Sequence, residues 1–207
     1  MIFTGYWMMT METESGGATE APMLGDHLAM DLLNTEARSE GAGVDYWHSG
    51  DDVLGWLARH GIVPPPRMAV DRDALLAQAL GLRALARRLI GQRKDEGEVD
   101  DAGGLNAYLH AAPSVPHLAR SPEGRWQLTR SARGDTVGAL LGPVAEAVAQ
   151  LLVEGDFGLV KQCEHPDCIL WFYDRTKAHK RRWCSMAVCG NRYKAAQFRK
   201  RGGEAQQ

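Results

Sequence analysis

The stretch Arg181-Arg-Trp-Cys184-Ser-Met-Ala-Val-Cys189-Gly-Asn-Arg192 decides the fold of this chain, together with Cys163 and Cys168 before it. The 207 residues contain four cysteines, which are the pairs Cys163/Cys168 and Cys184/Cys189. Each pair has four residues between its members, and fifteen residues separate the pairs. Four thiols at such paired spacing are typical of a tetrahedral zinc site. The sequence therefore predicts one Zn²⁺ held by Cys163, Cys168, Cys184 and Cys189.

Two other interpretations of the cysteines remain open. Disulfides belong to oxidising compartments, and nothing in the sequence directs the chain to one. Buried thiols without metal would be scattered along the chain rather than gathered in 27 consecutive residues. Zinc is the interpretation that the spacing favours.

The residues around the cysteines predict a treble-clef finger. An aromatic and β-branched run follows Cys168 and suits a strand, a basic turn covers 175–182, and good helix formers occupy 193–201. The last cysteine then lies at a helix N-terminus, whose positive pole and free N–H groups favour the thiolate form that zinc requires.

The stretch 181–192 resembles the CGNR zinc-finger proteins, as do Phe172 and Asp174 behind the first cysteine pair. In that family the finger follows an ABATE-type domain. The segment Leu28-Ala-Met-Asp-Leu-Leu-Asn-Thr35 looks like the opening motif of that domain, and 143–153 like its last helix. The resemblance covers roughly 24–201 and implies a stress-linked bacterial transcription regulator with a zinc cofactor.

Length and resemblance together predict the domain organisation. A chain of 207 residues suits one domain of about 150 residues and a small metal module. We expect a disordered N-terminal segment over 1–22, an ABATE-like domain over 23–156 and the finger over 157–203. The expected fold class is α+β, with N-terminal helices packed on a small antiparallel sheet and a C-terminal treble-clef four-cysteine zinc finger.

Periodicity and capping residues predict the helices of the first domain. One runs from Gly50 to about His60, a long one from Asp71 or Asp73 to about Gln92, and a short one over 104–110. A fourth has Pro143 in its first turn and ends at Gly155. The arginines of the long helix, which are Arg83, Arg87, Arg88 and Arg93, are expected mostly on its outer face.

Two strands are expected at 115–120 and 125–130, joined by a type I turn, Ser121-Pro-Glu-Gly124. A two-stranded sheet alone is marginal, so a third strand is expected from 27–33 or 135–141.

Charge divides the chain into two unlike parts. Residues 161–201 carry eleven basic and three acidic side chains, whereas residues 1–160 carry thirteen basic and 22 acidic ones. A basic module of this kind predicts contact with DNA. The expected contacts are Lys180, Arg181, Arg182, Arg192, Lys194, Arg199 and Lys200. The two parts could instead attract each other, within one chain or in a homodimer.

Catalytic signatures are missing from the sequence, which has no phosphate loop, dinucleotide fingerprint or nucleophile elbow. Four protein ligands would also leave zinc no open position, so we expect no enzyme. Asp31 and Asn34 are candidates for a ligand pocket, or for satisfying nearby main-chain groups. With no signal peptide or apolar run of about 20 residues in the sequence, we expect a cytoplasmic protein with no membrane contact.

Two functional hypotheses follow. In the first, the protein is a zinc-dependent transcription regulator whose finger binds DNA and whose N-terminal domain senses a small ligand or a partner. In the second, it is a sensor or protein-interaction module that does not bind DNA, and the finger is a structural staple.

Overall fold

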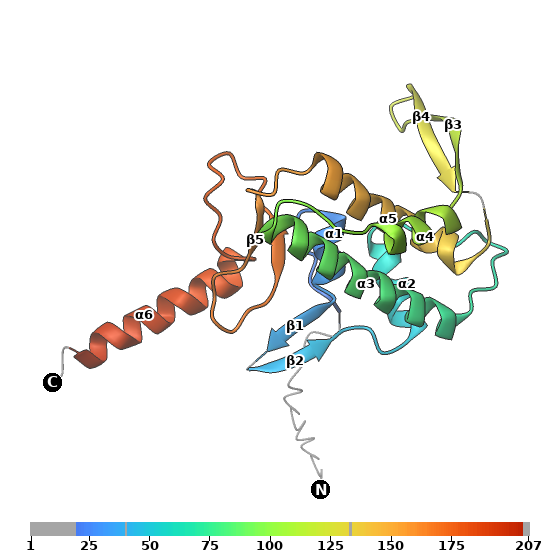
Figure 1. Cartoon of the computed structure of the whole chain (residues 1–207). Helices are drawn as coiled ribbons and strands as arrows, with labels where there is room; N and C mark the ends of the chain where they lie inside the picture. The colour runs from blue at the N-terminus through green and yellow to red at the C-terminus, as the bar shows by residue number, and fades with distance from the viewer. Residues whose placement is uncertain (1–19, 40, 133, 205–207) are drawn as a thin grey trace, which may run out of the picture.

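A computed structural model describes residues 20–39, 41–132 and 134–204. Within these residues the chain is an α+β protein built from helices and three two-stranded antiparallel hairpins, which confirms the predicted class (Figure 1). We expected residues 1–22 to be disordered, and residues 1–19 of this segment lie outside the described residues. Ala21, near its end, packs into the core with 3% of its surface exposed.

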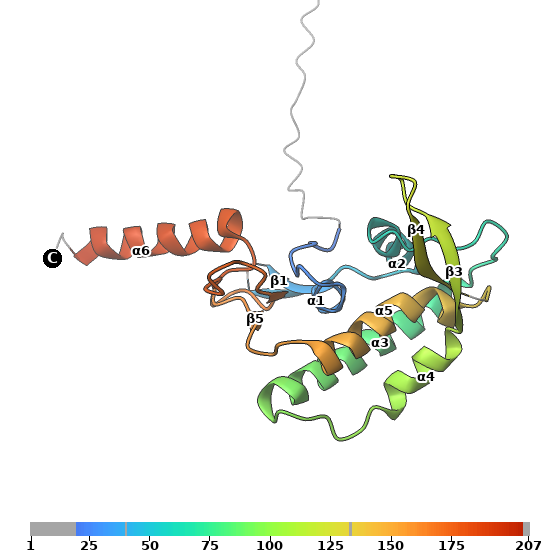
Figure 2. The same cartoon turned by 90° about the horizontal axis from the view of Figure 1, so that it is seen from above.

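The helices of the first domain pack on one another. Their bounds are α1 Leu28–Leu33, α2 Gly50–Arg59, α3 Arg72–Asp95, α4 Gly103–Ala111 and α5 Val137–Glu154. The two long helices, α3 and α5, lie side by side with α4 against them (Figures 1 and 2). The helical period of α3 predicted its core face, and Leu75, Ala79, Leu82, Ala86, Leu89 and Ile90 have no exposed surface.

Capping residues set the ends of α2 and α3 as the sequence predicts. The Ser49 hydroxyl accepts the Asp52 N–H at 3.3 Å, and the Asp52 carboxylate accepts the Ser49 N–H at 2.8 Å, a reciprocal capping box. Gly61 follows α2 with φ +74°, a conformation that glycine adopts without strain. Asp71 caps α3 through its bond from the Ala74 N–H at 3.0 Å.

The prediction of a third strand is wrong. The strands of the first domain form two separate hairpins, β1 Glu36–Ser39 with β2 Ala42–Asp45, and β3 Ser114–Arg120 with β4 Trp126–Ala132. Residues 28–33 are α1 instead, and 137–141 begin α5. Five of the six residues of α1 are buried, and so short a buried run shows no period that separates helix from strand.

The turn between β3 and β4 has the predicted bond, from the Gly124 N–H to the Ser121 carbonyl at 2.8 Å. The β3–β4 hairpin projects from the helices, so the helices do not cover it as a sheet (Figure 2).

Helix α5 begins six residues earlier than expected, which places Pro143 inside it. The Thr136 hydroxyl accepts the Ala139 N–H at 3.1 Å and caps the earlier start, and Gly155 caps the end as predicted. By length and composition α5 is able to cross a membrane, but half of it is buried in the protein, where it contacts α1, α3 and α4. These core contacts account for its apolar character.

Arg83 is buried, contrary to the expectation that the arginines of α3 lie outside. Its guanidinium contacts Asp45 at 2.5 Å and Glu36 at 3.1 Å, and donates to the Thr35 hydroxyl at 3.0 Å. The Trp47 ring covers it at 5.3 Å. The β1–β2 hairpin supplies these partners, and a charge buried with such partners is tolerated.

The second unit contains β5 Val160–Gln162, β6 Trp171–Tyr173, the π-helix η1 Met186–Gly190 and α6 Asn191–Glu204. The expected strand after Cys168 and the expected helix over 193–201 are both present. Helix α6 starts from η1 and projects away from the rest of the protein in both views (Figures 1 and 2).

Candidate metal centre and nucleic-acid surface

The structure brings the four cysteines together. Their Sγ atoms all lie within 4.8 Å of one another, with Cys184 3.5 Å from Cys189 and 3.7 Å from Cys168. All four are free thiols. With Zn–S bonds of about 2.3 Å, a tetrahedral site has sulfurs about 3.8 Å apart. The cluster therefore has the size that zinc requires.

Main-chain bonds hold each pair of cysteines in place. The first pair, Cys163 and Cys168, lies in the loop between β5 and β6, and the Cys163 N–H donates to the Leu170 carbonyl at 2.9 Å across the base of that loop. For the second pair, the Ser185 hydroxyl accepts the Val188 N–H and caps η1, the turn that contains Cys189. A Cβ at Gly190 would lie 2.5 Å from the Met186 sulfur and 3.2 Å from the Trp183 ring, so a side chain there would require Met186 to move.

The thiols perturb one another strongly. Hydrogen bonds from Cys168 and Cys184 hold the pKa of the Cys163 thiol well below its usual range. The bond to Cys163 raises the pKa of Cys184, and burial raises the pKa of Cys189 to about 12. Four thiolates this close require a cation between them, and a bound divalent metal deprotonates such thiols outright.

Asp174 supports the turn that follows β6. It has no exposed surface, and its carboxylate accepts bonds from Lys161 Nζ at 2.7 Å, from the Thr176 hydroxyl at 2.6 Å and from the Arg181 main chain at 2.9 Å. Burial alone would raise the pKa of Asp174, but these donors outweigh burial and lower it. The carboxylate therefore fixes the basic turn beside the cysteines.

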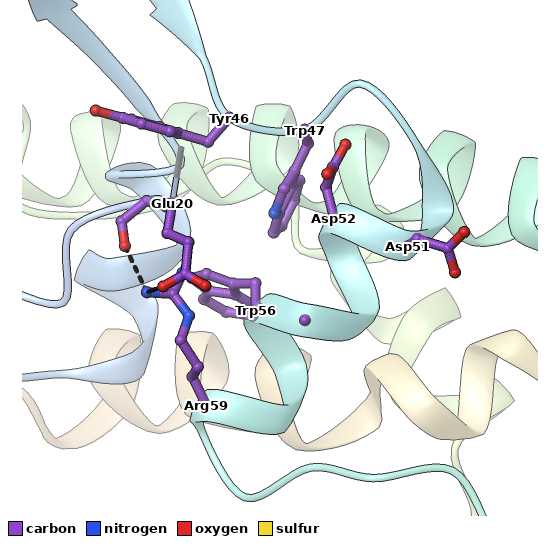
Figure 3. A pocket seen from close by; sticks show the side chains of 9 residues that line it. Glu20, Tyr46, Trp47, Asp51, Asp52, Trp56 and Arg59 are labelled. Carbon is purple, nitrogen blue, oxygen red and sulfur yellow. Dashed lines mark hydrogen bonds and ion pairs between the residues drawn. The ribbon is translucent and has the colours of Figure 1, made fainter. Parts of the chain in front are cut away.

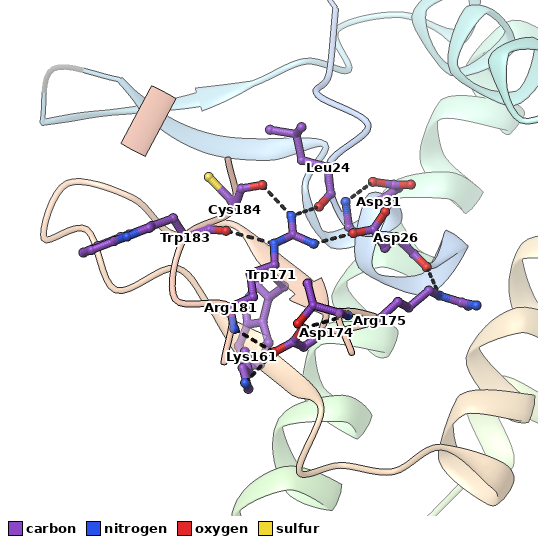
Figure 4. A network of polar contacts seen from close by, with 12 residues as sticks. Leu24, Asp26, Asp31, Lys161, Trp171, Asp174, Arg175, Arg181, Trp183 and Cys184 are labelled. Atoms are coloured by element: carbon purple, nitrogen blue, oxygen red, sulfur yellow. Dashed lines mark hydrogen bonds and ion pairs between the residues drawn. The ribbon is translucent and has the colours of Figure 1, made fainter. Parts of the chain in front are cut away.

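The Arg181 side chain joins the cysteine cluster to the first domain (Figure 4). Its guanidinium donates to the carbonyls of Trp183 and Leu24 at 2.9 Å and of Cys184 at 2.5 Å, and pairs with Asp26. It also lies 4.2 Å from the centroid of the Phe172 ring. The sequence assigned Arg181 to DNA, but in this arrangement its donors are engaged inside the protein.

Comparison with protein families agrees with this two-part organisation. A family model named ABATE, with the description "putative stress-induced transcription regulator", matches residues 26–155. The chain belongs to the ABATE family. A second model, the CGNR zinc finger, matches residues 160–202, so both parts of the predicted resemblance are confirmed and the chain binds zinc. The comparison with curated proteins gives no match.

The residues proposed from sequence as an ABATE ligand site make main-chain bonds. Asn34 has no exposed surface; its amide donates to the Trp171 carbonyl and accepts the Trp171 N–H, both at 2.8 Å. Asp31 accepts the Gly25 N–H at 2.8 Å, and its burial raises its pKa to about 6. Asn34 thus ties the ABATE helix α1 to the finger strand β6, and the ligand role of both residues stays a prediction.

Unlike Arg181, Arg182 and Lys180 of the CGNR finger are exposed to solvent. Arg182 is exposed, pairs with Glu164 at 2.6 Å and lies 4.9 Å from the centroid of the Trp183 ring, whereas Lys180 is exposed without an ion pair among the described residues. The remaining predicted DNA contacts, Arg192, Lys194, Arg199 and Lys200, are exposed on α6.

Phe172 is fully buried, as expected for a core of so small a finger. Trp183 is only half-buried, and its ring lies 4.8 Å from that of Tyr193 at the start of α6.

The ABATE unit has a cavity of about 280 Å³ that the sequence did not predict (Figure 3). Its aromatic wall is formed by Trp47 and Trp56, which meet edge to face at 5.3 Å. The indole nitrogens of both are buried and have no hydrogen-bond partner among the described residues. Arg59 and Glu20 meet at 3.3 Å in front of Trp56. No motif in the sequence identified this cavity.

Proposed function

We propose that this protein is a zinc-dependent, cytoplasmic bacterial transcription regulator. In this proposal Cys163, Cys168, Cys184 and Cys189 hold one zinc ion in a treble-clef finger. The finger binds DNA through α6, and the ABATE unit senses a small ligand or a partner. With four protein ligands the zinc has no open position for a substrate, so its role is structural.

The projection of α6 into solvent carries the DNA part of the proposal (Figure 2). Residues 191–204 contain five basic side chains and one acidic residue, Glu204. The basic residues Arg192, Lys194, Arg199, Lys200 and Arg201 are all exposed and form no ion pair within the described residues. Cations held away from the acidic ABATE unit suit a polyanion, because phosphates supply much of the affinity of proteins for DNA.

The half of the finger nearest the ABATE unit supports the alternative, a structural staple. Arg181 bonds the Leu24 carbonyl, Trp171 bonds the Asn34 side chain, and Phe172 packs in a cluster with Ala37 of the ABATE unit. The two roles involve different residues, so a finger that staples the fold through Arg181 remains able to bind DNA through α6. The homodimer that the charge pattern allowed stays a prediction.

Binding of the zinc-loaded full chain to mixed-sequence duplex DNA, measured at several salt concentrations, tests the proposal. The double variant Arg192→Ala/Arg199→Ala should bind less tightly and lose about two units of salt slope. Its matched control is Arg67→Ala/Arg88→Ala, which removes two exposed positive charges from the ABATE unit. Equal loss in both variants, or no binding by the parent at low salt, would count against α6 as the DNA contact.

The cavity beside Trp47 and Trp56 is the better candidate for ligand sensing. The Arg59 guanidinium, whose partner Glu20 is 70% exposed, suits a small carboxylate that displaces Glu20, with the Trp47 and Trp56 rings beside it as an apolar wall. A side chain at Gly55 would extend into open space beside the cavity. If a panel of small carboxylic acids raises the melting temperature, Gly55→Leu should abolish the effect and Gly91→Leu on α3 should not. A parent protein that none of these acids stabilises would refute the carboxylate assignment.

A further inference from the structure

The side chains of α6 fall into three stripes along the helix. At 3.6 residues per turn, Ala195 and Phe198 lie about 60° apart and form a narrow apolar stripe. Arg192 and Arg199 lie about 70–90° to one side of its centre, and Lys194 and Arg201 lie the same angle to the other side. Basic residues on opposite sides of a helix therefore flank one apolar stripe.

The apolar stripe is on the free side of α6. Phe198 is 79% exposed, and Ala195 is exposed beside it. Tyr193, on nearly the opposite side, faces the finger through its ring contact with Trp183 at 4.8 Å. Lys200 also lies on that opposite side, about 170° from the stripe. The free side thus combines an apolar centre with two positively charged edges.

We infer that α6 enters the major groove of DNA with Ala195 and Phe198 against the base edges, its two basic stripes contacting the two phosphate walls. This inference rests on the proposed DNA binding. The major groove is about 12 Å wide and admits one helix, and its floor carries thymine methyl groups that apolar side chains contact. Its walls are the phosphates, which fix the position of a bound helix.

Charge complementarity favours DNA over an anionic membrane surface. A helix that lies in a membrane buries a wide apolar face with several large side chains. Among the residues of α6, Phe198 is the one large apolar side chain on the stripe, and its neighbour is alanine. Two opposite basic stripes match two phosphate walls, whereas a flat anionic surface would contact one side of the helix.

Single substitutions test which side of α6 faces the DNA. In the zinc-loaded full chain, Lys194→Ala and Arg199→Ala should each reduce affinity for duplex DNA about eightfold at 0.1 M salt and lower the salt slope by about one. Lys200→Ala removes the same charge from the same helix and should change affinity less than twofold. Equal losses at Lys200 and Arg199 would overturn the assignment of faces.

Selection from a randomised duplex pool tests the role of Phe198. The parent should enrich thymine at one or more positions by about fivefold or more, and Phe198→Ala should lose that preference while keeping its salt slope. Trp126→Ala, at another exposed aromatic residue, on the β3–β4 hairpin, should leave the preference unchanged. A preference that survives Phe198→Ala would refute base contact by this stripe.

Failure of the inference is distinguishable from failure of the proposed function. DNA binding with equal losses at every basic residue of α6 would retain the function and reject the orientation. No binding to any duplex, with Phe198-dependent binding to vesicles containing anionic lipid, would reject both.

Discussion

Replacing Arg181 with alanine should lower the free energy of unfolding of the zinc-loaded protein by about 3 kcal/mol, because it leaves partly buried main-chain carbonyls without their donor. The change removes the donor to three main-chain carbonyls, those of Leu24, Trp183 and Cys184, and the partner of Asp26. Each buried acceptor left without a donor costs about 1–3 kcal/mol. About 1 kcal/mol for each carbonyl is expected because all three are only partly buried, and the ion pair adds little because 52% of the Asp26 side chain is exposed.

Arg182→Ala is the matched control. It removes the same charge from the neighbouring residue, whose ion pair with Glu164 has 54% and 49% of the two side chains exposed. Exposed ion pairs contribute little to stability, so this variant should unfold close to the parent. Urea unfolding of zinc-loaded protein, followed by circular dichroism, gives both free energies. Equal stability of the two variants would refute the structural role of Arg181, and weaker DNA binding without loss of stability would return Arg181 to the phosphate contacts.

Four more variants test the metal, the pH response and the packing of α2. Cys189→Ser should reduce zinc from one ion per chain to none and unfold the finger, since metal binding to such modules provides on the order of 10 kcal/mol of folding free energy. Metal analysis measures the zinc content and circular dichroism the unfolding. The helicity of the ABATE unit should remain. Burial raises the pKa of Asp31 to about 6, so the folded state binds the Asp31 proton more tightly than the unfolded state does. The free energy of unfolding should therefore fall by up to about 3 kcal/mol as pH rises from about 4 to 6. Asp31→Asn should therefore be more stable than the parent above pH 6, and an advantage that does not shrink at lower pH would contradict this cause. In α2, Gly55→Ala should raise the melting temperature because nothing lies within 4 Å of the new methyl group, whereas Gly50→Ala should lower it because its Cβ would lie 2.3 Å from the Arg72 carbonyl oxygen.

The helices of the ABATE unit could be predicted because their signals are local. Ser49 and Gly61 bound α2, and Asp71 begins α3, whose apolar period of 3.6 marks its core face. The helix over 28–33 was mistaken for a possible strand, since this run is apolar at nearly every position and its N-cap is a histidine, whose ring accepts the Ala29 N–H at 3.1 Å. The start of α5 was predicted six residues too late, because the sequence around Pro143 does not distinguish a proline in the first turn of a helix from one inside it.

The metal centre was predictable and its connection to the ABATE unit was not. Cysteine spacing is a short-range signal, so it identified the residues that the structure brings together. Arg181 lies in a basic turn whose composition indicates phosphate contact, but its partner Asp26 is 155 residues away in the chain. Arg83, which was expected on the outer face of α3, is buried against its partner Asp45, which lies 38 residues away in the chain, beyond the reach of a local pattern. Sequence patterns show how many charges a segment has, and tertiary structure decides which of them remain free.

The junction between the two units links zinc binding to the ABATE fold. Cys184 contributes its thiol to the cluster and its carbonyl to Arg181, which also bonds Leu24 and Asp26. Between those two residues, the Gly25 N–H donates to Asp31 and the Gly25 carbonyl accepts the Tyr173 N–H at 2.8 Å. Because the same contacts support the cluster and the ABATE packing, the free energy by which zinc binding stabilises that packing equals the free energy by which the packing strengthens zinc binding. The position of α6, which starts beside the last cysteine, therefore depends on the segment 24–26 as well as on the metal, and a signal that moves this segment would reach the proposed DNA contact without changing any residue of it.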